Sequence, residues 1–104
     1  MTDTEVRDVP DQSAYEVTVD GGHAGWAYYS RGQGEVVFTH TEVDDAFEGQ
    51  GVGSALARGA LDDARARGEQ VLPRCAFIAG WIAHHEDYLD LVPEQHHAAV
   101  RARG

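Results

Sequence analysis

The sequence of 104 residues predicts an α+β domain built on a mixed sheet. Three observations carry this prediction: three strand-like segments separated by short glycine turns, an amphipathic segment of helical period after them, and a short apolar segment beyond it. Strands joined by tight turns pair antiparallel, whereas a strand reached through a helix lies parallel to the strand before it. We therefore expect three antiparallel strands, a helical crossover and a fourth strand.

Residues 15–43 contain the three expected antiparallel strands. The first has apolar residues at alternate positions from Tyr15 to Val19, and Asp20-Gly21-Gly22 supplies a hairpin turn. An aromatic-rich strand follows over residues 23–30, and a second glycine turn leads to the β-branched strand 35–43. Strict alternation along this third strand predicts two faces, one with Val36, Phe38, His40 and Glu42 and the other with Val37, Thr39, Thr41 and Val43.

The crossover helix is expected from Val52 to Arg67, where small and apolar residues recur at helical spacing. Gly59 inside it predicts close approach to another element, since glycine weakens a helix interior. The fourth strand is expected over residues 70–74. Pro73 has no N–H to donate, so we expect the sheet to open near it, with Cys75 at the opening.

The remaining segments are predicted to flank or close this domain. Residues 1–14 are polar with little periodicity, which predicts a flexible lead. A second helix is expected from Ala76, and the packed region closes at residue 92. Residues 93–104 are interpreted as a polar tail that is either frayed or a terminal helix.

Charge and cysteine content limit the function classes. Eighteen Asp and Glu against eight Lys and Arg give a formal net charge of −10, which disfavours nucleic acid and anionic membranes and favours a cationic partner such as an amine. The single cysteine excludes an internal disulfide and a Cys-x-x-Cys site. With no signal-peptide pattern and no long apolar run, we expect a cytoplasmic protein, monomeric or weakly dimeric.

Glycines at positions 49, 51 and 53 precede the crossover helix, whose first N–H groups have no intrahelical partner. Such a turn either binds a phosphate or serves only as a flexible connection. No lysine follows Gly53, as a nucleotide P-loop would require, and the third glycine of the dinucleotide fingerprint is missing. ATP and NAD are therefore both disfavoured.

The stretch Val43–Leu56, V-D-D-A-F-E-G-Q-G-V-G-S-A-L, resembles the acetyl-CoA segment of the GNAT superfamily of N-acetyltransferases. In that family Arg/Gln-x-x-Gly-x-Gly/Ala follows a strand and opens a helix. The resemblance extends through His40-Thr41-Glu42-Val43 and through Pro73-x-Cys75 before a helix with His85 and Tyr88, over roughly residues 15–92. It implies a GNAT-like fold with α/β/α layers and a splayed fourth strand.

The resemblance also implies a function and a cosubstrate site. Acetyl-CoA would donate an acetyl group to a primary amine, small or carried on a protein. Backbone N–H groups of Gln50, Gly51, Val52, Gly53 and Ser54 would hold the pyrophosphate, and the strand end from Thr41 to Val43 would pair with the pantetheine arm. Glu48 departs from the pattern, because the family usually has arginine or glutamine there.

Four residues are candidates for the chemistry. His40 and Glu42 share a face and could deprotonate the amine, directly or through water. Cys75 could carry the acyl group, protonate the departing thiolate or simply pack in the core, and His85 is the fourth candidate. His84 and His85 are adjacent, so they lack the i,i+4 spacing of a metal pair, and no metal site is expected.

Two functions other than catalysis remain open at this point. The chain could be a CoA-binding module that acts as a sensor or binds a partner, or a structural interaction protein whose glycine run binds nothing. In larger GNAT relatives a pair of helices separates the first two strands, whereas Gly21-Gly22 connects them here. That difference predicts an open acceptor side, suited to a bulky or macromolecular amine.

Overall fold

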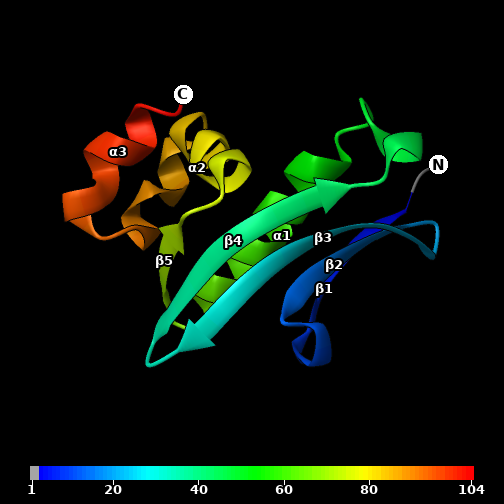
Figure 1. Ribbon diagram of the computed structural model, residues 1–104, viewed down its shortest axis with the longest axis horizontal. Coiled ribbons are helices and arrows are strands. Elements are labelled where there is room, and N and C mark those ends of the chain that lie inside the picture. Colours follow the sequence, from blue (N-terminus) through cyan, green and yellow to red (C-terminus); the bar gives the residue numbers. More distant parts are fainter. Residues whose placement is uncertain (1–2) are drawn as a thin grey trace.

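The computed structural model describes residues 3–104. It contains one mixed sheet whose strands lie in sequence order, from β1 to β5 (Figure 1). The successive pairs from β1 to β4 are antiparallel, and β5 is parallel to β4. The α+β class, the mixed sheet and the parallel crossover are thereby confirmed. The strands are β1 Thr4–Val9, β2 Ala14–Val19, β3 Gly22–Gly32, β4 Glu35–Val43 and β5 Gln70–Pro73.

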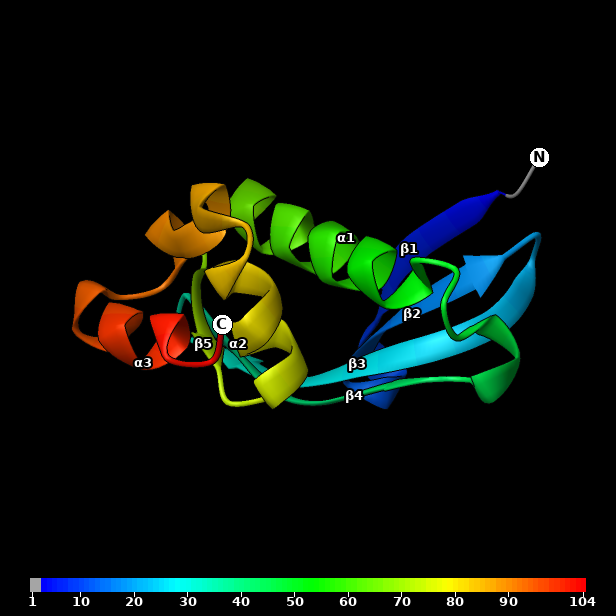
Figure 2. The same cartoon turned by 90° about the horizontal axis from the view of Figure 1, so that it is seen from above.

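Three α-helices pack with this sheet: α1 Val52–Ala66, α2 Ala76–Ala83 and α3 His97–Arg101. α1 lies along one face of the sheet, α2 lies beside α1, and α3 packs on α2 (Figure 2). In residues 3–104 no helix covers the opposite face of β2, β3 and β4. The expected second helix layer therefore does not extend over these strands, because tight turns connect them. Short 3₁₀ turns span Pro10–Gln12, Asp45–Phe47, Glu86–Leu91 and Glu94–His96.

Strand β1 corrects the prediction of a flexible lead over residues 1–14. Thr4–Val9 pairs with β2 in continuous register, while residues 1 and 2 lie outside the described residues. A Cβ added at Gly59 of α1 would lie 2.6 Å from Cβ of Val6, so the predicted close approach at this glycine is confirmed and its partner is β1. The strand was missed because few apolar side chains mark it.

A β-bulge in β4 decides which side chains face α1. Tyr28 pairs with His40 and Tyr29 pairs with Phe38, so Thr39 is the extra residue. One extra residue inverts the alternation, since side chains point to the two faces with a period of two. The prediction that His40 and Glu42 share the face of Val36 and Phe38 is therefore wrong. After the bulge, Thr41 and Val43 lie on the α1 face of the sheet, whereas His40 and Glu42 lie on the opposite, open face.

The sheet opens between β4 and β5, as the proline predicted. β5 pairs with β4 only as far as Phe38, whose carbonyl accepts hydrogen bonds from the N–H groups of both Arg74 and Cys75, each at 3.0 Å. The N–H of Asp44 donates to β3, to the carbonyl of Ala24 at 2.8 Å. Because backbone groups alternate in direction along a strand, those of Thr41 and Val43 face the opening.

The C-terminal residues are more ordered than a polar tail. Val100 of α3 is buried and belongs to the apolar core, so the alternative of a terminal helix is confirmed. Within residues 3–104 no helix is long and apolar enough to cross a membrane.

Candidate functional site

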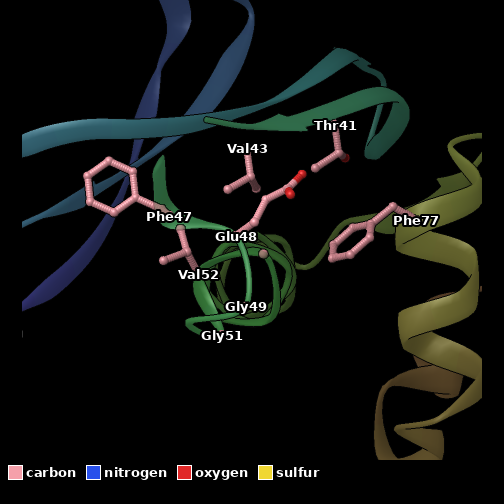
Figure 3. Close-up of a pocket in the computed structure, with 9 residues that line it drawn as sticks. Thr41, Val43, Phe47, Glu48, Gly49, Gly51, Val52 and Phe77 are labelled. Carbon is pink, nitrogen blue, oxygen red and sulfur yellow. The ribbon is translucent and has the colours of Figure 1, made fainter. Parts of the chain in front are cut away.

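A groove of about 310 Å³ lies between the free edge of β4 and the start of α1 (Figure 3). β4 forms one wall, the glycine turn and the first turn of α1 form the floor, and α2 supplies Phe77 at one end. The groove joins the two backbone features that the sequence singled out. Its walls are formed by Thr41, Val43, Phe47, Glu48, Gly49, Gly51, Val52, Gly53 and Phe77.

The floor of the groove is an uncapped helix N-terminus. Gly51 is the N-cap of α1 with φ +75°, and no side chain caps the helix. The first intrahelical bond runs from the N–H of Ala55 to the carbonyl of Gly51 at 3.0 Å, so the three preceding N–H groups, from Val52 to Ser54, lack helical partners. The first turn contains no acidic residue. These features fit a phosphate group, which needs convergent N–H donors and a positive dipole end.

Phe77 narrows the groove opposite the helix start. A Cβ at Gly53 would lie 2.9 Å from the Phe77 ring, so only glycine fits here without displacing that ring. Phe77 is 43% exposed and is the only large hydrophobic side chain so exposed within the described residues. The sequence analysis placed the second helix here and gave Phe77 no role in a site. The signal that could have shown its role was its mismatch with the buried stripe of Ile78 and Ile82 on the same helix.

Glu48 extends into the groove. Figure 3 shows its side chain reaching from the loop toward Thr41 and Val43 on β4. The carboxylate thus lies in the passage that an extended ligand would need, beside the uncapped start of α1. A negative charge there opposes a second anion unless the side chain rotates into solvent.

Cys75 lies directly behind the β4 wall. Its thiol donates a hydrogen bond to the hydroxyl oxygen of Thr41 at 3.3 Å, and the residue is 8% exposed. Cys75 is also the N-cap of α2. The structure therefore brings Cys75 to the edge of the groove through Thr41, while the residue also belongs to the apolar core.

Gln50 and Ser54 direct their side chains away from the groove. The Gln50 amide donates back to the carbonyl of Ala46 at 3.4 Å. The Ser54 hydroxyl accepts a 2.8 Å hydrogen bond from the Trp81 indole N–H and ties α1 to α2. The backbone N–H of Ser54 remains available for the predicted phosphate site, whereas that of Gln50 already donates to the carbonyl of Phe47 at 3.4 Å.

His40 and Glu42 lie together on the open face of β4. His40 Nε2 is 3.4 Å from Glu42 Oε2, and their side chains are 65% and 55% exposed. The Tyr28 hydroxyl donates to Glu42 at 3.4 Å. The bulge thus separates these two residues from Thr41, which lies on the helix side of the same strand, and from Cys75, which contacts Thr41 there.

His85 is not brought to the groove. It follows α2, whereas Cys75 precedes it, and the eight-residue helix between them is about 12 Å long. Its ring stacks on Trp81 with centroids 3.8 Å apart, and its Nδ1 lies 2.7 Å from the Trp81 carbonyl oxygen. These contacts give His85 a packing role at the far end of α2.

The family model described as GCN5-related N-acetyl-transferase matches residues 14–91 of the chain. The chain belongs to this family. The match begins at β2 and includes the bulged β4, the glycine turn, α1, β5 and α2, so every element of the groove lies inside it. Among curated proteins, none is similar enough to count as a match. Membership of this GCN5-related family supports an acetyltransferase-type function.

Proposed function

We propose that this GCN5-related protein transfers an acetyl group from acetyl-CoA to a primary amine. The observation that carries the proposal is the groove itself, in which an uncapped helix start adjoins an unpaired strand edge. A pyrophosphate needs the first feature, and an extended arm with amide groups needs the second. Few other ligands would use both.

Each wall of the groove then has a binding role. The N–H groups from Gly51 to Ser54 hold the pyrophosphate, aided by the dipole of α1. The N–H of Gln50 joins them only by giving up its 3.4 Å hydrogen bond to the carbonyl of Phe47. The backbone groups of Thr41 and Val43 pair with the amides of the arm. Acetyl-CoA supplies the activated thioester when it is bound.

The amine approaches from the other side of β4. Glu42 and His40 are exposed there, at the same level of the strand as Thr41. One of them accepts the proton that the ammonium must lose before it can attack, directly or through a water. The two substrates therefore meet at the edge of β4 from opposite faces of the sheet.

Cys75 has two possible roles beside this simple direct transfer. Its position behind Thr41 supports proton donation to the departing thiolate or transient acylation of the sulfur. In the Cys75→Ala variant, we expect CoA binding to persist and any acyl-enzyme detected by intact mass to disappear. If this variant keeps full activity, Cys75 only packs.

Glu48 supports a second candidate function, a CoA-binding module without catalysis. Its carboxylate lies in the groove where the family usually has a donor side chain. Such a module would bind CoA weakly and act as a sensor or partner-binding protein.

Thioester consumption with a panel of amines separates these functions. The protein is incubated with acetyl-CoA and each amine, and free thiol is followed while CoA binding is measured by thermal shift. Amine-dependent thiol release with acetylated product supports the transferase. A melting shift without product supports the binding module, and no shift at saturating CoA overturns both.

A further inference from the structure

We propose that the open face of the sheet binds a lysine side chain carried on a polypeptide. The inference rests on the proposed function and names its acceptor. The binding surface is a row of rings that runs along β3, passes to β4 and ends beside Glu42. We call it the aromatic row; its members are His23, Trp26, Tyr28 and His40.

The rings of the aromatic row form a continuous series. Ring centroids are 4.8 Å apart for His23 and Trp26, 6.2 Å for Trp26 and Tyr28, and 6.2 Å for Tyr28 and His40. The last pair is stacked, with an interplanar angle of 15°. Trp26 and Tyr28 are only partly buried, so their rings remain accessible from solvent. Packing with α1 does not explain the row, because it lies on the other face of the sheet.

The charges at the two ends of the row differ. At the β2 end, Glu16 is paired with Arg7 at 3.0 Å, and its other carboxylate oxygen lies 2.7 Å from Nδ1 of His23. At the β4 end, the ion pairs within the described residues give Glu42 only His40 as a partner. Glu42 therefore offers a carboxylate at the end of the row that lies beside the β4 edge.

This arrangement suits a primary ammonium on an aliphatic stem. The ammonium can pair with Glu42 while the stem lies across Tyr28 and Trp26, whose ring faces attract cations. The net charge of −10 favours the approach of a cation. A neutral acetylated product loses both interactions, which favours its release.

The shape of the face favours a polypeptide over a free small amine. Small ligands bind in concave sites. The groove, the hollow at the β3–β4 turn and the hollow between β5 and α3 contain no member of the aromatic row in their walls. β2 ends at Val19 and β3 begins at Gly22, so their connection cannot cover the face. An open surface contacts an extended chain more fully than a small molecule.

The test measures peptide binding without CoA. Capped glycine-serine peptides carry one central residue: lysine, norleucine or acetyl-lysine. Amide chemical shifts of β3 and β4 measure and locate binding in every variant, and Trp26 fluorescence reports it independently in the proteins that keep Trp26. We expect saturable binding of the lysine peptide only, weakened about fivefold by Glu42→Gln and by Trp26→Leu. Glu94→Gln removes the same charge from an exposed site on another element and should leave the affinity unchanged.

Three binding outcomes would overturn the inference. Equal binding of the norleucine peptide would show that the ammonium is not recognised, and no saturation at millimolar lysine peptide would show that this face is not its site. A dimer by sedimentation that protects Trp26 would assign the face to a second copy. Saturable lysine binding without acetyl transfer would leave this inference intact and overturn only the proposed transferase.

Discussion

At the C-terminal end of α1 the polar side chains are paired with one another, whereas at its N-terminal end backbone groups are left unpaired. Arg31 binds Asp8 at 3.2 Å, Glu69 at 2.7 Å and the Tyr15 hydroxyl. Tyr15 in turn donates to Asp63 at 2.5 Å. This closed network joins β1, β2, β3 and α1. The groove at the other end has free N–H groups on α1 and an unpaired edge on β4.

This contrast assigns stability to the C-terminal end of α1 and ligand binding to its N-terminal end. A buried polar network stabilises the fold only when every member has a partner, and no buried side-chain nitrogen or oxygen in residues 3–104 lacks one. Unpaired backbone groups in a solvent-accessible groove can form new hydrogen bonds when a ligand binds. We therefore expect mutations at the network to change unfolding and mutations at the groove to change ligand affinity.

The largest expected effect comes from breaking the network at its centre. Arg31 has a side chain only 18% exposed, and its replacement leaves Asp8 and Glu69 facing each other without their shared cation. Arg31→Met should lower the free energy of unfolding by about 3 kcal/mol, measured by urea denaturation. The exposed pair Arg65–Asp90 provides the control, since Arg65→Met should cost less than about 1 kcal/mol. Equal losses in the two variants would refute a special role for the network.

The second effect concerns the groove. Gly51→Val places a side chain at the uncapped helix start and should weaken CoA binding about tenfold or more, measured by calorimetry. Gly34→Val is the matched control, because both glycines have positive φ, +75° and +78°, and open space around them. Both variants should lose about 1–2 kcal/mol of stability through backbone strain. If the Gly34 variant binds CoA equally weakly, strain rather than the groove explains the loss.

A smaller effect tests the contact between β1 and α1. Gly59→Ala gains helix propensity, yet its methyl group would meet Val6, so we expect a net loss of about 1–2 kcal/mol in unfolding free energy. Adding Val6→Ala should recover part of that loss in a double-mutant cycle. A stabilising Gly59→Ala would mean that β1 does not pack on the helix.

The smallest effect appears only at alkaline pH. Burial, with a hydrogen bond to Asp8, raises the pKa of Tyr29 to about 12 from 10.0. The folded state then holds its proton while the unfolded chain loses it, so stability is full below pH 10 and falls as the pH rises toward 12. Urea denaturation from pH 8 upward should show this decline, and Tyr29→Phe should make it shallower. An identical decline in that variant would remove Tyr29 as its cause.

Much of the groove was predictable because its signals are local. The glycines at 49 and 51 have the positive φ that the turn requires, and the buried side of α1 follows the 3.6-residue period. Pro73 likewise marked where β4 and β5 separate. The fold class and the position of the groove follow from such short segments.

The features that were missed depend on pairing with distant segments. Nothing in the local pattern of β4 indicates that Thr39 is the bulged residue, since β3 determines the register. Likewise, the position of β1 is defined by distant contacts, namely its pairing with β2 and the approach of Val6 to Gly59 of α1. The bulge decides which side chains of β4 face α1, and β1 completes the sheet.

The most direct measurement of the central claim is an amide chemical-shift titration of the protein with CoA. The account predicts that the largest shifts occur from Gly49 to Ser54 and at Thr41 and Val43, with small shifts around Arg31 at the network end. Absent shifts in the glycine turn, or larger shifts at the network, would contradict it.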